Sequence, residues 1–150
     1  MRLRKIVAVV MFLAFCVVAN AADRKHIVTP RPAGFKTVPF SDGVLVGNTL
    51  YVAGHIGADA KTGLPPASVE EEARLAMDGI KQTVEAAGLS MDDLVSVQVF
   101  CTDLKLYDTF NAVYKTYFQG DYPARAFVGA DKLLLGGRFE VMGIAIKKSQ

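Results

Sequence analysis

Two charged residues occupy positions in which the surrounding pattern is typical of buried strands. Arg125 lies in Pro-Ala-Arg-Ala-Phe-Val, and Glu140 lies in Arg-Phe-Glu-Val-Met-Gly-Ile. An unpaired buried charge is costly, so each group is expected to have a partner, and the two can be each other's partners. A guanidinium group can bind a carboxylate through two parallel hydrogen bonds. A carboxylate in a dry pocket can act as a base toward water or a substrate.

A structural ion pair, or a surface pair on an edge strand, explains the same two residues without a catalytic role. The spacing of Arg125 and Glu140 alone does not distinguish the structural role from the catalytic one.

Other sites are not indicated. The sequence has no phosphate-binding glycine motif and no GxSxG motif, and His26 and His55 lack metal-ligand spacing. Asn111 can contact a ligand or simply pack within a helix. Cys101, in an apolar run, is expected to be a buried, unreactive thiol.

The elements that must position these residues form one α+β domain. Alternating valine-rich segments predict strands, and apolar residues at spacings of three and four predict helices. Both helices need one face of a sheet, and the strands are apolar on both sides, so we expect self-association through the second face. In order, the elements are a hairpin of strands 43–46 and 49–53, a helix from Ser68 to Gly88, a strand 94–102, a helix from Asp103, and strands 124–130 and 138–146.

The first 21 residues have the composition of a cleavable signal peptide. Three basic residues precede an apolar run over 6–18, which is too short to cross a bilayer as a helix, and Ala19-Asn20-Ala21 follows it. A retained membrane anchor or a buried core helix is the alternative. We predict cleavage near Ala21 and a periplasmic or secreted protein.

The rest of the chain is close to neutral. Three of the 17 Lys and Arg residues, and none of the 15 Asp and Glu residues, lie in the signal, which leaves a net charge of −1. No basic cluster remains that would indicate nucleic acid or a membrane surface as a partner. Residues 22–33, with prolines and charges, predict an extended or loose arm, and residues 34–148 form the domain.

Six stretches of the sequence resemble one known family. In order they are VPFS (38–41), GNTLYVAGHIG (47–57), VEAAGLSMDDLVSVQVFCTDL (84–104), FNAVYKTYF (110–118), YPARAFV (122–128) and FEVMGIAI (139–146). Together they resemble the RidA/YjgF family of enamine/imine deaminases, over about residues 34–147. The resemblance implies a chorismate-mutase-like α+β sandwich, with two helices on one face of a mixed sheet. It also implies a homotrimer with small-molecule sites between subunits.

The resemblance also implies roles for individual residues. Arg125 would bind the carboxylate of a small substrate, and Glu140 would position or activate the water that hydrolyses an imine. Asn111 and Gly54 match further positions of the family's site. No cofactor or metal is implied.

Three departures from the family leave two functions open. Phe40 lacks the hydroxyl of the usual tyrosine, Ala53 replaces the common serine, and Phe127 is larger than the usual residue and is expected to crowd the pocket. One hypothesis is hydrolysis of reactive 2-imino or enamine acids to 2-keto acids and ammonia. The other is a non-catalytic trimer of the same fold that binds a small ligand or acts as a holdase.

Overall fold

The computed structural model describes residues 23–30 and 38–147. The predicted signal peptide lies outside the described residues. The elements are β1 (Arg24–Ile27), β2 (Gly43–Val46), β3 (Thr49–Ile56), α1 (Val69–Ala86), η1 (Met91–Asp93), β4 (Leu94–Cys101), η2 (Leu104–Leu106), α2 (Tyr107–Tyr114), η3 (Lys115–Tyr117), β5 (Ala124–Gly129), η4 (Leu134–Gly136) and β6 (Phe139–Ile146), where η denotes a short 3-10 helix.

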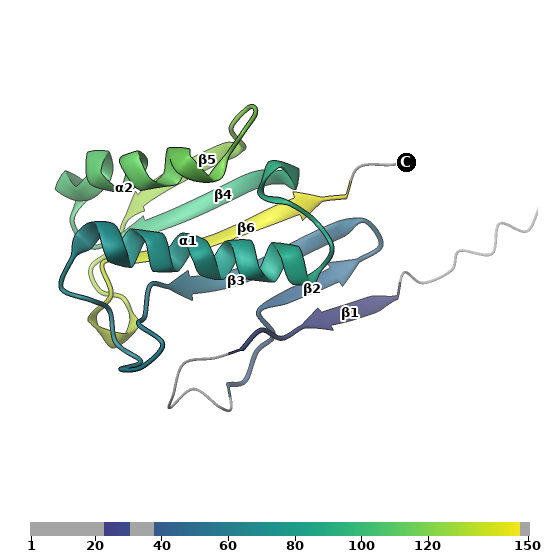
Figure 1. Ribbon diagram of the computed structural model, residues 1–150, viewed down its shortest axis with the longest axis horizontal. Helices are drawn as coiled ribbons and strands as arrows, with labels where there is room; N and C mark the ends of the chain where they lie inside the picture. The colour runs from purple at the N-terminus through teal and green to yellow at the C-terminus, as the bar shows by residue number, and fades with distance from the viewer. Residues whose placement is uncertain (1–22, 31–37, 148–150) are drawn as a thin grey trace, which may run out of the picture.

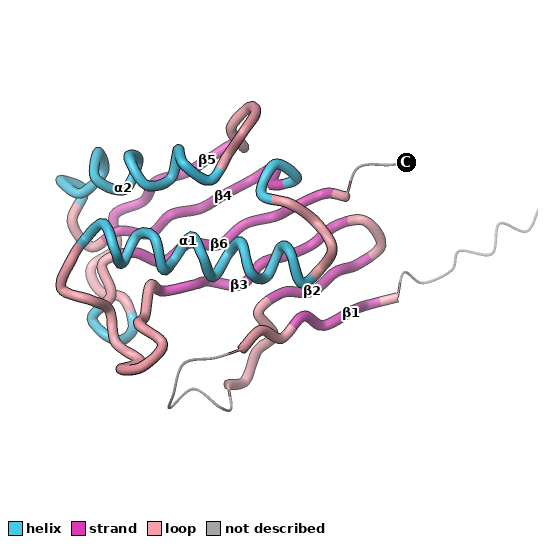
Figure 2. Tube along the Cα trace, in the orientation of Figure 1, coloured by secondary structure: helices cyan, strands magenta, loops and turns pink. Residues whose placement is uncertain are grey.

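The strands form one mixed sheet in the order β1-β2-β3-β6-β4-β5. Neighbouring strands are antiparallel except β4 and β5, which are parallel. Helices α1 and α2 lie side by side over the same face of the sheet (Figures 1 and 2). The predicted α+β sandwich with one helix-covered face is confirmed.

Helix α1 begins where the sequence predicts, because Ser68 satisfies a backbone donor of the first turn. The Ser68 hydroxyl accepts a hydrogen bond from the Glu71 backbone N–H at 3.2 Å. The apolar stripe then packs on the sheet as predicted; its fully buried members are Ala73, Ala76, Met77, Ile80 and Val84. Within the described part of the chain, no helix is both long and apolar enough to span a membrane.

The second helix begins later than predicted. The Asp103 side chain accepts a hydrogen bond from the Lys105 backbone N–H at 3.0 Å, and Leu106 N–H donates to the Asp103 carbonyl at 2.9 Å. This i to i+3 bond closes the 3-10 turn η2, so α2 starts only at Tyr107.

The predicted arm over residues 22–33 contains a strand that the sequence did not indicate. Strand β1 pairs with β2, but its first three residues are exposed, so it shows no hydrophobic alternation. Just after β1, the backbone N–H and hydroxyl of Thr29 donate to the buried Asp42 carboxylate at 2.7 and 3.1 Å. Residues 24–29 are therefore joined to the sheet rather than loose.

The face of the sheet away from α1 and α2, here called the open face, is not covered by any helix or strand of the described residues (Figure 1). Its apolar side chains include Tyr51, Val128, Met142 and Ile146, which are 53%, 42%, 36% and 39% exposed. An exposed apolar sheet face of this kind is typical of a subunit contact.

Candidate functional site

The strand register places Arg125 and Glu140 on opposite faces of the sheet. Arg125 pairs with Val97, whose side chain is buried on the helix-covered face. Glu140 pairs with Phe100, three residues further along β4, and successive side chains of a strand alternate between faces. The interpretation in which these two charges pair with each other is therefore wrong for a single chain.

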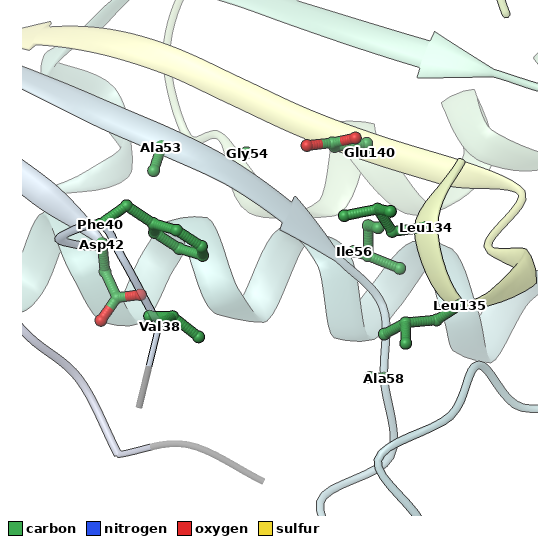
Figure 3. Close-up of a pocket in the computed structure, with 10 residues that line it drawn as sticks. All are labelled: Val38, Phe40, Asp42, Ala53, Gly54, Ile56, Ala58, Leu134, Leu135 and Glu140. Atoms are coloured by element: carbon green, nitrogen blue, oxygen red, sulfur yellow. The ribbon is translucent and has the colours of Figure 1, made fainter. Parts of the chain in front are cut away.

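Glu140 lies in a cavity of about 510 Å³ on the open face, here called the Glu140 cavity. Figure 3 shows Phe40 on one side of this space, Leu134 and Leu135 on the other, and the Glu140 carboxylate between them, against β3. Most of the other lining residues are apolar as well. Among the described residues, no group of three His, Cys, Asp or Glu side chains could hold a metal ion.

Strand β3 passes so close to Glu140 that any side chain at position 54 would displace the end of the Glu140 side chain. The pairing of β3 with β6 shifts register between Val52 and His55, and His55 turns toward α1, where its Nε2 lies 3.1 Å from Thr83 Oγ1. A Cβ atom on Gly54 would lie 2.0 Å from Glu140 Oε1. The bare backbone of Gly54 therefore leaves room for the carboxylate and limits its position.

A second carboxylate, that of Glu72, is completely buried behind the Glu140 cavity. It accepts hydrogen bonds from the Arg138 and Phe139 backbone N–H groups and from Arg138 Nε. The guanidinium group of Arg138 also donates to backbone carbonyls of residues 66–68. This Glu72–Arg138 pair fixes α1, the loop before it and the start of β6, two residues before Glu140.

Arg125 occupies a separate place, here called the Arg125 niche, between β5 and α2. Its Nη2 donates to Asn111 Oδ1 at 2.7 Å. Its guanidinium carbon lies 4.5 Å from the ring centre of Tyr114 and 5.7 Å from those of Tyr107 and Phe127. Cation–π contacts and the Asn111 amide thus hold the guanidinium group in one orientation.

Two buried donors in the Arg125 niche lack an acceptor. Arg125 Nη1 and the Tyr114 hydroxyl have no hydrogen-bond partner among the described residues. Burial raises the pKa of Tyr114 to about 12, although the nearby Arg125 charge opposes this, so the hydroxyl stays protonated at neutral pH. Buried donors are normally paired, so the niche is suited to a ligand with acceptor oxygens.

The six site residues that the sequence predicted fall into two groups. The ring of Phe127 packs against those of Tyr107 and Phe110, with centroids 5.0 and 5.6 Å apart, and it does not line the Glu140 cavity. Phe127 lies beside Arg125 instead, so its expected crowding concerns the Arg125 niche and stays a prediction. Phe40, Gly54 and Glu140 form the group on the open face, and Arg125, Asn111 and Phe127 form the group in the Arg125 niche.

Sequence reasoning missed the site roles of four neighbouring residues. The spacing of Tyr114 from Phe110 in α2 indicated only core packing, and no sequence pattern singled out Tyr107. Leu134 and Leu135 stand in a turn, where exposed apolar side chains are a usable signal for contact with another molecule.

The structure thus defines an α+β domain with an Arg125 niche and a Glu140 cavity, and known proteins are similar to this chain in sequence and in fold. Residues 31–147 match the family described as Endoribonuclease L-PSP. The 2-iminobutanoate/2-iminopropanoate deaminase of Bos taurus is 37% identical over 124 residues, which cover 82% of this chain and 90% of that protein.

Solved structures share the fold. E. coli TdcF with bound serine has a TM-score of 0.75 and 35% identity, covering 83% of this chain and 100% of that one. RidA from the bacterium Psychrobacter sp. PAMC 21119 has a TM-score of 0.75 and 34% identity, covering 82% and 99%. The chain belongs to the RidA/YjgF family, as the sequence resemblance indicated.

Proposed function

We propose that this protein hydrolyses reactive 2-imino or enamine acids to 2-keto acids and ammonia. The observation that carries the proposal is the Glu140 carboxylate, held against the backbone of Gly54 in an otherwise largely apolar cavity. A carboxylate placed in this way can take a proton from a single water molecule. The deaminase name of the Bos taurus relative supports the same chemistry.

The proposed reaction needs one base and one water molecule. Glu140 accepts a proton from water while the water oxygen bonds to C2 of the imine, and the C=N electron pair moves to nitrogen. Glu140 returns the proton to nitrogen, which gives the neutral carbinolamine. Glu140 then takes the hydroxyl proton of the carbinolamine and passes it to nitrogen while the C=O bond forms and the C–N bond breaks, so ammonia and the 2-keto acid leave. General base catalysis of this kind contributes about 10²- to 10⁴-fold in rate.

We propose that the complete site forms between copies of the chain in a homotrimer. Arg125 would bind the substrate carboxylate, whose oxygens supply the acceptor that its Nη1 lacks. Arg125 and Glu140 lie on opposite faces of one sheet, so an Arg125 niche and a Glu140 cavity from neighbouring copies must meet. The apolar open face offers the contact surface. Serine, which is bound in the E. coli TdcF structure, is a carboxylate of suitable size.

The family's description as an endoribonuclease names a different activity, which this site supports less well. RNA binding depends on cationic groups that contact phosphates. The Glu140 cavity carries a negative group instead. Neither histidine of the chain lines it: His26 lies beside Ser41, and His55 packs against α1.

The direct test is ammonia and keto-acid release from imino acids that an amino-acid oxidase in excess generates in situ. We expect the protein to accelerate release, and Arg125→Ala and the isosteric Glu140→Gln to lower the rate by about 100-fold or more. No acceleration with alanine-, leucine- and phenylalanine-derived imino acids would reject the deaminase function. The non-catalytic ligand-binding or holdase-like trimer would then be the better hypothesis.

We propose in addition that residues 1–21 export the protein to the periplasm or the medium. The support is the order of basic residues, apolar run and Ala19-Asn20-Ala21. Mass spectrometry of the protein from cell fractions should show an N-terminus near Ala22 outside the cytoplasm. An intact N-terminus retained in the cytoplasm would reject the proposal.

A further inference from the structure

The wall of the Glu140 cavity opposite Phe40 consists of two leucines that the described residues leave exposed (Figure 3). Leu134 is 77% and Leu135 42% exposed, and Phe40 is 53% exposed. Figure 3 shows the Phe40 ring and the two leucines facing the same space, next to the Glu140 carboxylate. Binding an apolar side chain between these groups is favourable, because it removes apolar surface from water.

The backbone at Leu135 is in a conformation that bulky residues rarely adopt. Its φ is 60° and its ψ is 10°, in the left-handed region, where Gly or Asn would be unstrained. A strained residue persists only where the surrounding structure enforces it, and such residues cluster at ligand sites. The strain therefore points to a role for the Leu135 side chain at the cavity.

The turn that carries these leucines is anchored at its end. The Gly137 N–H donates to the Leu134 carbonyl at 3.0 Å, and a Cβ atom on Gly137 would lie 2.8 Å from Ile56 Cγ2. The next residue, Arg138, is held by the buried Glu72. The leucine wall is thus preformed beside Glu140.

We infer that Phe40, Leu134 and Leu135 form a side-chain subsite for bulky apolar 2-imino acids. This inference rests on the proposed deaminase function. With its reactive C2 near Glu140 and its carboxylate at an Arg125 niche, a substrate would direct its side chain between the ring and the leucines. A cavity of about 510 Å³ can accommodate an aliphatic chain of about four carbons or an aromatic ring, and each buried methylene adds to discrimination. The preferred substrates are therefore imino acids such as those derived from leucine and phenylalanine.

The test compares kcat/KM for imino acids generated from D-alanine, D-leucine and D-phenylalanine by D-amino-acid oxidase. The expected preference for the leucine- and phenylalanine-derived imino acids over the alanine-derived one is at least about tenfold. Leu134→Ser and Leu135→Asn should reduce this preference about tenfold. Asn tolerates the left-handed backbone, so the second variant removes the apolar wall without adding strain. Leu64→Ser, at an exposed leucine that does not line the cavity, is the matched control and should leave the preference unchanged.

The outcomes separate this inference from the proposed function. Activity without a preference for bulky side chains, or a preference that survives both variants, overturns the subsite and leaves the deaminase in place. No activity on any of the three imino acids rejects the deaminase and the subsite together. If the variants change the oligomeric state in light scattering while the preference of the remaining oligomer persists, the leucines serve a subunit contact and the subsite is overturned.

Discussion

The Glu140 cavity and the Arg125 niche differ in how each holds its charged group. Glu140 stands at the edge of a largely apolar cavity, placed by close approach of the backbone at Gly54. Arg125 is enclosed by the rings of Tyr107, Tyr114 and Phe127 and by the Asn111 amide. Glu140 is positioned by a neighbouring backbone that has no side chain, and Arg125 is positioned by side chains packed around it.

This difference fits the two roles proposed above, a base at Glu140 and a carboxylate-binding group at Arg125. A base needs room for water and substrate beside its carboxylate, and a glycine provides that room. A carboxylate-binding group gains from a fixed orientation, and stacked rings provide it. Because the two places lie on opposite faces of the sheet, we expect a substitution in one to leave the local structure of the other unchanged.

The largest effect on catalysis is expected from Gly54→Ala. The added methyl group would displace the end of the flexible Glu140 side chain, so kcat should fall by at least about 100-fold while the fold is kept. Gly120→Ala is the matched control, because a Cβ atom there meets nothing within 4 Å. Circular dichroism checks the fold of both variants. Full activity of Gly54→Ala would show that the position of Glu140 does not matter for the reaction.

The largest effect on stability is expected from Glu72→Ala, behind the Glu140 cavity. The change leaves Arg138 Nε and two backbone N–H groups without their acceptor, so the free energy of unfolding should fall by about 3–5 kcal/mol. Glu85→Ala removes an exposed pair with Lys81, in which the charged atoms are 3.8 Å apart, and should cost less than about 1 kcal/mol. Urea denaturation measures both. Equal losses would contradict the anchoring role of the Glu72–Arg138 pair.

The smallest effect concerns the Arg125 niche at alkaline pH. The pKa of Tyr114 is raised to about 12 in the folded protein, so the protonated form is favoured by folding. Its stabilisation is complete below the unfolded-state pKa of about 10 and is lost as the pH rises toward 12. Between pH 8 and pH 11, Tyr114→Phe should therefore lose about 1 kcal/mol less unfolding free energy than the unsubstituted protein. Identical pH dependence in urea denaturation would show that Tyr114 is not held protonated by burial. Tyr117 is present in both proteins, so any effect of its ionisation cancels when their pH dependences of unfolding free energy are compared.

Most of the fold could be predicted from the sequence because short sequence patterns indicate helices and strands that fit one α+β sandwich. The Ser68 cap, the apolar stripe of α1 and the alternation of β4 each appear in a single short window. Strand β1 could not be predicted, because an edge strand with three exposed residues lacks that alternation. Its position depends on pairing with β2 and on the contact between Thr29 and Asp42.

The site was predictable residue by residue but not in its arrangement. The sequence identified Arg125 and Glu140, but their faces depend on strand register, which the strand pattern alone did not fix. The burial of Glu72 could have been predicted, because it precedes Ala76 and Ile80 by four and eight residues and so lies in the apolar stripe of the helix. A charge in that register requires a partner, and Arg138 provides it from 66 residues away.

The most direct test of a site shared between copies is complementation between two inactive variants. Arg125→Ala and Glu140→Gln chains carrying different tags are co-expressed, and mixed oligomers are purified through both tags. If each site takes its arginine and its glutamate from neighbouring copies, every mixed trimer has one complete site, so about a third of the sites are restored. We predict activity in the mixed oligomers at about that level, and activity at least about 100-fold below the unsubstituted protein in either variant alone. Mixed oligomers as inactive as their parents would contradict a site formed from the two faces of neighbouring chains.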